Sequence, residues 1–272
     1  MTSISDQPEA PGQERIVSIH QPHYFPWLGL VAKIACSDVF IILNSVQFEK
    51  NGWQNRTRYS TSGGLKFLTL PIRHTGIVSN TKTIREIELA DIRATQKHWQ
   101  TLRQRYRREP GWPRIAERLE EILVREYDQL LPVALATTRL TLELFAIKPR
   151  LVLASALGVP GSKTDRLVNL VKAVRATHYL SGAGAKEYLE PELFKRAGLQ
   201  LSYQEFTHPI YQQLDGVGFM PGAFALEWFL ADPDGAAARL YRQLRDNARQ
   251  PPRCLLGVRG SAVAPDLPYR NG

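Results

Sequence analysis

The chain has 272 residues, of which 43% are hydrophobic and 22% charged, and its formal net charge is +9. This composition is typical of a globular protein and excludes a wholly disordered, collagen-like or coiled-coil chain. No run approaches the roughly 18 apolar residues that a membrane helix needs, and the two cysteines cannot form a zinc site. The first 13 residues lack the basic and then apolar pattern of a secretion signal, so we expect a cytoplasmic protein with no membrane partner.

The positive charge leaves two interpretations open. A basic surface attracts nucleic acids, nucleotides, sugar nucleotides or acidic membranes. Alternatively, the arginines are spread evenly over a solvated surface. The same choice applies to residues 97–108, a strongly basic helical segment that is either a solvated face or a surface for the phosphates of a nucleotide or tRNA.

Strand and helix patterns alternate in the N-terminal part of the chain. Residues 15–20 and 38–44 are short apolar runs typical of buried strands, and residues 28–36 between them have helical spacing. A strand, a helix and a strand within thirty residues predict a βαβ unit with a right-handed crossover. We expect a further strand at residues 65–72.

The pattern turns helical over about residues 91–147, and strand-like runs then return. Strands are predicted at 150–155, 178–181 and 199–206, and helices at 163–176, in the region up to 195 and at 224–230. This alternation predicts an α/β fold with a mostly parallel, Rossmann-like sheet, helices on both faces and a helical insertion. We expect one domain over residues 14–248, a disordered tail at 1–13 and an extended tail at 249–272.

Ligands of open parallel sheets bind beyond the carboxyl ends of the strands, and the first turn at that edge is chemically unusual. Residues 20–29 read His-Gln-Pro-His-Tyr-Phe-Pro-Trp-Leu-Gly. The prolines fix the backbone at low entropic cost, which suits a preorganised pocket. A tightly packed aromatic corner is the alternative interpretation.

Three further segments lie at the same predicted edge. Residues 158–165 place Lys163 at a helix start, which indicates either an anion site or an ordinary helix cap, while the spacing excludes a P-loop. Residues 181–186 contain a Gly-Ala-Gly turn that permits close backbone approach to a ligand. Residues 44–58 carry amide side chains and arginines suited to a sugar, nucleobase or carboxylate, or they form a solvated loop.

We predict that these segments form one site without a protein-bound metal. The predicted catalytic residues are His20, His23 and Lys163. The predicted substrate- or nucleotide-binding residues are Gln21, Tyr24, Trp27, Gln47, Gln54, Asn55, Arg56, Arg166, Ser181, Gly182 and Gly184.

Several of these motifs resemble the WbqC-like family over roughly residues 15–230. The likeness is carried by His-Gln-Pro at 20–22, Pro-Trp-Leu-Gly at 26–29, Ser-Asp-Val-Phe at 37–40, Gln-Asn-Arg at 54–56 and Tyr-Leu-Ser-Gly-x-Gly at 179–184. The resemblance implies an accessory enzyme of surface-polysaccharide or natural-product biosynthesis. Some members look like enzymes that attach an amino acid or acyl group to an amine.

A fainter resemblance of layout concerns residues 20–48, which are similar to the opening of the nucleotidyltransferase-like superfamily, pantothenate synthetase in particular. The signature His-x-Gly-His is missing. The likeness implies ATP, with Mg, as cofactor, attack of a carboxylate on ATP, and amide formation from the resulting adenylate.

Three functions are therefore compared. The leading hypothesis is an amide-forming ligase or acyltransferase that joins a small carboxylate to an amine, with ATP, an acyl carrier or an aminoacyl-tRNA supplying the activated group. A tRNA- or nucleic-acid-binding protein, or an aminoacyl-tRNA-dependent transferase, is the alternative, although no RRM, KH or zinc-finger signature is present. A non-catalytic scaffold would not need such a polar sheet edge.

Overall fold

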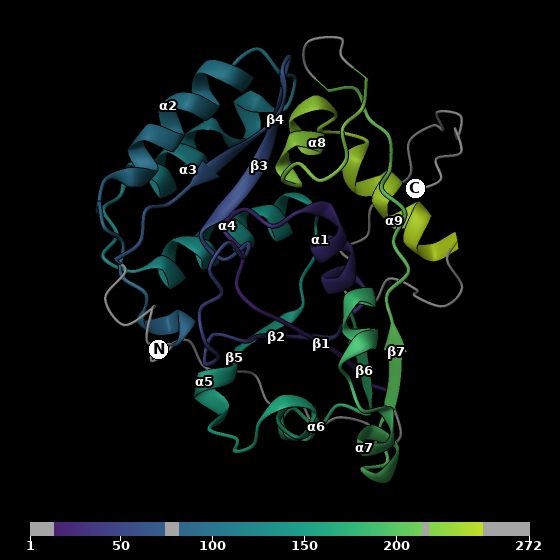
Figure 1. The fold of residues 1–272 in the computed structure, drawn as a ribbon. Helices are drawn as coiled ribbons and strands as arrows, with labels where there is room; N and C mark the ends of the chain where they lie inside the picture. The colour runs from purple at the N-terminus through teal and green to yellow at the C-terminus, as the bar shows by residue number, and fades with distance from the viewer. Residues whose placement is uncertain (1–13, 74–81, 214–217, 247–272) are drawn as a thin grey trace.

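The computed structural model describes residues 14–73, 82–213 and 218–246 (Figure 1). The tails expected at residues 1–13 and 249–272 lie outside the described residues. Within the described ranges, no helix combines the length and apolar character needed to cross a membrane.

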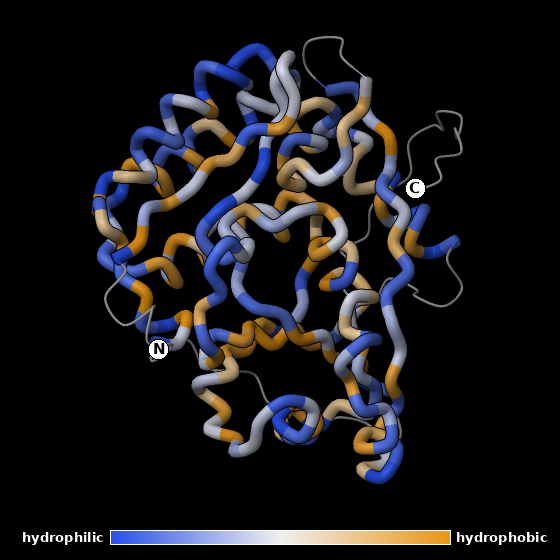
Figure 2. The backbone as a smooth tube through the Cα atoms, in the orientation of Figure 1, coloured by the Kyte–Doolittle hydropathy of each residue, from blue (hydrophilic) through white to orange (hydrophobic). Residues whose placement is uncertain are grey.

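A five-stranded sheet forms the centre of the fold. Its strands lie in the order β5-β2-β1-β6-β7, and every neighbouring pair is parallel. The bounds are β1 (Ile16–His20), β2 (Val39–Ile42), β5 (Arg150–Leu153), β6 (His178–Ser181) and β7 (Gln200–Tyr203). Strands β1 and β2 are hydrophobic and buried on both faces, as expected for the middle of a parallel sheet (Figure 2). The predicted Rossmann-like sheet is confirmed.

Helices cover both faces of this sheet. Helix α1 (Leu28–Ala35) packs on one face, together with Phe40 and Ile42 of β2. Helices α6 (Lys163–Ala173) and α7 (Pro191–Arg196) pack on the other face, against Val17 and Ile19 of β1. Alternate residues of a strand therefore belong to two separate hydrophobic cores.

A long insertion joins β2 to β5 and contains the predicted helical block. Its helices are η1 (Ile84–Glu86), α2 (Ala94–Tyr106), α3 (Trp112–Val124) and α4 (Leu130–Leu144). The strand expected at 65–72 is β4 (Gly64–Thr69), which pairs antiparallel with β3 (Arg56–Thr61) in a sheet of its own. Part of the segment interpreted as a polar loop is therefore a strand, because the turn before Gly64, with φ of +109°, closes a hairpin.

Four shorter elements complete the described fold: α5 (Ala154–Leu157), η2 (Ala183–Glu187), α8 (Leu226–Ala231) and α9 (Ala236–Asp246). Helix α8 is the helix predicted at 224–230, and it buries Glu227. The Glu227 carboxylate accepts hydrogen bonds from the Ser60 backbone N–H at 2.9 Å, the Tyr106 hydroxyl at 2.5 Å and the Gln213 amide at 2.9 Å. This carboxylate thus joins the hairpin, α2 and α8.

Candidate functional site

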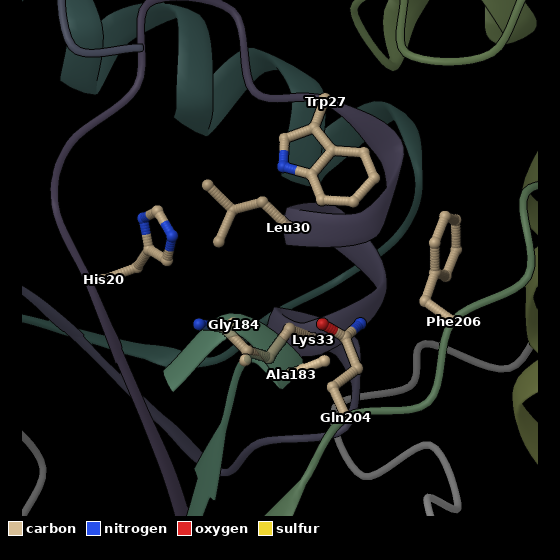
Figure 3. Close-up of a pocket in the computed structure, with 9 residues that line it drawn as sticks. His20, Trp27, Leu30, Lys33, Ala183, Gly184, Gln204 and Phe206 are labelled. Carbon is tan, nitrogen blue, oxygen red and sulfur yellow. The ribbon is translucent and has the colours of Figure 1, made fainter. Parts of the chain in front are cut away.

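A pocket of about 330 Å³ lies at the carboxyl ends of β1 and β6. The chain leaves β1 toward β2 on one side, whereas β6 lies on the other side, so the strand order reverses between them. Such switch points are the usual ligand sites of open α/β sheets. The end of β1 and helix α1 contribute His20, Trp27, Leu30 and Lys33 to the lining, and the remainder comes from residues 182–184, 204 and 206 (Figure 3).

His20 is the last residue of β1, and its ring projects into the pocket (Figure 3). Its Nδ1 lies 3.0 Å from the backbone oxygen of Gln21. Because a carbonyl oxygen only accepts hydrogen bonds, Nδ1 carries the proton and the neutral ring has its free lone pair at Nε2. Burial, followed by the charges of Lys33 and His23, holds the pKa of His20 well below 6.5. His20 is therefore a neutral base at physiological pH.

His23 lies beside His20, with ring centroids 4.8 Å apart and the planes nearly perpendicular. Burial, together with the charge of Lys33, lowers the pKa of His23 to about 3. Its ring is buried and is not part of the pocket lining. His23 therefore supports the His20 ring as a neutral neighbour.

Lys33 is a pocket residue that the sequence analysis missed. It lies within α1, a helix whose residues are all buried, and only 3% of its surface is exposed. Its Nζ donates a hydrogen bond of 3.3 Å to the backbone oxygen of Ile19, and burial lowers its pKa from 10.5 to about 7. A lysine inside the otherwise apolar stretch Leu-Gly-Leu-Val-Ala-Lys-Ile-Ala is a signal that the sequence does contain.

The other end of the pocket is aromatic. Trp27, 37% exposed, meets Phe206 edge to face with ring centroids 5.6 Å apart, and Leu30 lies between Trp27 and His20 (Figure 3). Gln204 donates a 2.8 Å hydrogen bond to the backbone oxygen of Gly29, which ties the end of β7 to α1. The pocket thus offers a polar, nitrogen-bearing end and an apolar end.

Four of the predicted site residues line this pocket together: His20, Trp27, Gly182 and Gly184. Their neighbours in the sequence make other contacts. The Gln21 amide oxygen accepts a hydrogen bond from Gln54, and the Tyr24 hydroxyl lies 2.8 Å from Nδ1 of His98. Ser181 lies 3.5 Å from the hydroxyl of Tyr179, which packs in the core on the opposite face of the sheet.

Lys163 and Arg166 lie in the first turn of α6, at the same edge of the sheet as His20 but on the opposite face. Lys163 is exposed, and Arg166 donates to the Ser45 backbone oxygen at 3.0 Å and to its hydroxyl at 2.6 Å. The structure therefore does not bring Lys163 and His20 into one pocket, because the connection from β5 to β6 crosses the face opposite α1. Their catalytic roles stay predictions.

The amide- and arginine-rich segment, residues 44–58, makes most of its contacts within the insertion between β2 and β5. Gln47 forms an isolated bridge with Thr83, and the Asn55 amide donates to the Leu70 backbone oxygen at 2.8 Å. Arg56 donates to the Gly52 backbone oxygen at 3.1 Å, and its guanidinium lies 4.7 Å from the centre of the Phe67 ring. None of these side chains lines the switch-point pocket.

The sheet order and the pocket define a Rossmann-like α/β protein with a pocket at its switch point, where open α/β sheets usually bind ligands. The chain belongs to the WbqC-like protein family, whose model matches residues 21–230. A protein of Mycobacterium tuberculosis (strain ATCC 25618 / H37Rv), named Uncharacterized protein Rv1507c, is 31% identical over 215 residues, which is 78% of this chain and 91% of that relative. No solved structure matches the chain. The family resemblance expected from the motifs is confirmed.

Proposed function

We propose that this protein is an enzyme that forms an amide by joining a small carboxylic or amino acid to an amine, on an amino sugar or a natural-product intermediate. ATP, with Mg, would activate the carboxylate as an acyl adenylate with release of pyrophosphate, and the amine would then displace AMP to form the amide. The observation that carries the proposal is the neutral His20 ring, which presents its unprotonated Nε2 to a switch-point pocket.

His20 suits the proton transfer that amide formation requires. An amine that attacks an activated carbonyl must lose a proton, and a base positioned beside it removes that proton. The Nε2 lone pair serves as this base, while the hydrogen bond from Nδ1 to Gln21 holds the ring in place. A positioned general base contributes roughly 100- to 10,000-fold in rate.

The remainder of the pocket suits an acid. The residues that line it within the described ranges include no aspartate or glutamate, so an entering anion meets no like charge. Gly182 and Gly184 leave the backbone open to close approach by carboxylate or phosphate oxygens. The volume of about 330 Å³ is near the lower end of the usual range for ligand pockets, which suits a small acid with an apolar part beside Trp27.

The test is a reaction panel with the purified chain. Small acids and amino acids are combined with amino-sugar and diamine acceptors in the presence of ATP and Mg, and mass spectrometry detects amide products. We expect ATP-dependent product that falls by at least 100-fold in His20→Ala. His178→Ala is the matched control, since His178 begins β6 at the opposite edge of the sheet.

Each alternative result has a defined meaning. Product formed only from an acylated carrier protein or an aminoacyl-tRNA would show that the ATP step is wrong and that the protein is an acyltransferase. Product formation that His20→Ala leaves unchanged would overturn the assignment of His20 as the base. Absence of amide product with every donor would overturn the proposed reaction.

A further inference from the structure

Lys33 is a buried lysine, and no acidic side chain of the described residues compensates its charge. Its side chain is 3% exposed, and its Nζ has one hydrogen-bond partner, the backbone oxygen of Ile19 at 3.3 Å. An ammonium group has three donors, so at least two remain without a partner in the described part of the protein. No carboxylate of the described residues forms an ion pair with it.

The groups that surround Lys33 do not compensate its charge. The titratable side chains near it are His20, at the end of β1, and His23, in the turn that follows, and both are neutral bases. Helix α1 contains no other titratable residue, and the parts of the lining that follow β6 and β7 contribute none. A charged Lys33 is therefore disfavoured while the pocket holds no anion.

The backbone opposite Lys33 leaves room for a ligand. A Cβ atom built on Gly182 would lie 4.0 Å from the Lys33 Nζ, an ordinary van der Waals distance, so the space beside the nitrogen has room for another group. Figure 3 shows the Lys33 side chain crossing below the space that His20 and Trp27 face. The nitrogen is thus accessible from inside the pocket although it is shielded from bulk water.

Building on the proposed function, we propose that Lys33 binds the carboxylate of the acid substrate and takes up a proton as that carboxylate enters. The empty pocket holds Lys33 largely as a neutral amine above neutral pH, and the bound carboxylate stabilises the ammonium form. The proton comes from solvent, and no covalent bond forms or breaks. The carboxylate of the acid and the Lys33 ammonium therefore form an ion pair only when the acid binds.

This coupling has a measurable pH dependence. The pKa of Lys33 is lowered to about 7. At pH 8, Lys33 is therefore a neutral amine in roughly nine-tenths of the protein molecules without ligand. We expect uptake of about 0.9 proton per carboxylate bound at pH 8 and about 0.1 at pH 6. The Kd should rise about tenfold for each pH unit above 7, provided that the bound ammonium keeps its proton.

Isothermal titration calorimetry of the full chain tests the proposal. The probes are acetate, benzoate, glycine and inorganic phosphate, each titrated at pH 6 and pH 8 in Tris and in HEPES, whose ionisation enthalpies differ. The dependence of the observed enthalpy on the buffer gives the number of protons taken up. The variants are Lys33→Met, which removes the amine, and Lys33→Arg, which keeps the charge but does not titrate in this range. Lys186→Met is the matched control, because Lys186 is exposed and lies just after the same glycine turn.

We expect at least one carboxylate probe to bind wild type and Lys186→Met with proton uptake at pH 8. Lys33→Met should lose at least tenfold in affinity at pH 6, and binding by either Lys33 variant should lack the proton uptake. Binding without proton uptake, uptake that survives in Lys33→Met, or failure of every probe to bind would each overturn the proposal. Binding of phosphate alone would assign Lys33 to a phosphate group and overturn its assignment to the carboxylate.

The outcome is separable from that of the proposed reaction. Calorimetry measures binding of an acid in the absence of ATP and amine, so it does not depend on turnover. Carboxylate binding with proton uptake but no amide product would leave Lys33 as an anion site and refute amide formation. Amide product without proton uptake at Lys33 would support amide formation and refute the role proposed for Lys33.

Discussion

Replacing Lys33 by methionine should stabilise the protein without ligand, and the gain should depend on pH. Methionine has a similar length and no charge, so the substitution removes the buried amine and keeps most of the packing of this side chain beside β1. The native chain tolerates Lys33 at a cost, because its pKa falls from 10.5 in water to about 7 when buried. That difference in pKa corresponds to roughly 5 kcal/mol of lost stability, since one pKa unit is worth about 1.4 kcal/mol.

The sign of this pH dependence is set by whether the folded or the unfolded state binds more protons. Between pH 7 and pH 10.5 the unfolded chain keeps the Lys33 proton, whereas the folded chain has largely released it. The free energy of unfolding of the wild type therefore rises with pH in this range, and the penalty is fully present below pH 7. Relative to Lys33→Met, the deficit of the wild type should shrink by about 1.4 kcal/mol per pH unit above 7.

Urea unfolding followed by circular dichroism at pH 6, 7.5 and 9 measures this difference. We expect Lys33→Met to exceed the wild type by several kcal/mol at pH 6, with an advantage about 3 kcal/mol smaller at pH 9. Lys186→Met should differ from the wild type by a small amount that stays constant with pH, because Lys186 is exposed. If the difference in free energy of unfolding between Lys33→Met and wild type does not change with pH, the conclusion that Lys33 is buried without a counter-charge is refuted.

Three further predictions concern the site and its support. His20→Ala should lower turnover by about 100- to 10,000-fold while circular dichroism stays native, and a large loss of Tm with unchanged turnover would assign His20 to packing. Glu227→Gln should lower the free energy of unfolding by about 3 kcal/mol in urea titrations, because an amide NH2 donor replaces one carboxylate oxygen and then faces either Ser60 and Tyr106 or the Gln213 amide, which are donors too; a change below 0.5 kcal/mol would contradict this. Gly182→Leu should abolish carboxylate binding in calorimetry with a Tm close to that of the wild type, since its side chain would enter the pocket beside Lys33; unchanged binding would place the ligand elsewhere.

Local patterns in the sequence were sufficient for the strands of the main sheet and for one part of the site. The runs at 15–20, 38–44, 150–155, 178–181 and 199–206 correspond to the five parallel strands. The central strands β1 and β2 are short, largely apolar runs because both of their faces are buried, whereas the edge strands β5 and β7 are partly exposed. His20 and the glycines at 182 and 184 could be predicted because they lie at the end of a predicted strand or within three residues beyond it. Parallel strands bring such positions to one edge whatever the rest of the fold does.

Tertiary structure alone decided the remainder. The sequence does not reveal on which face of the sheet a connection packs, so it predicts one site for Lys163, Arg166 and His20 although α6 lies on the opposite face. It likewise predicted a strand at 65–72 without its hairpin partner, which long-range packing with α8 supports through Glu227. Lys33 interrupts the apolar pattern of α1, but the sequence does not show whether the side chain reaches solvent or stays buried. Only the packing of α1 against β1 and β6 turns it into a buried amine without a counter-charge, because charge compensation depends on neighbours far away in the sequence.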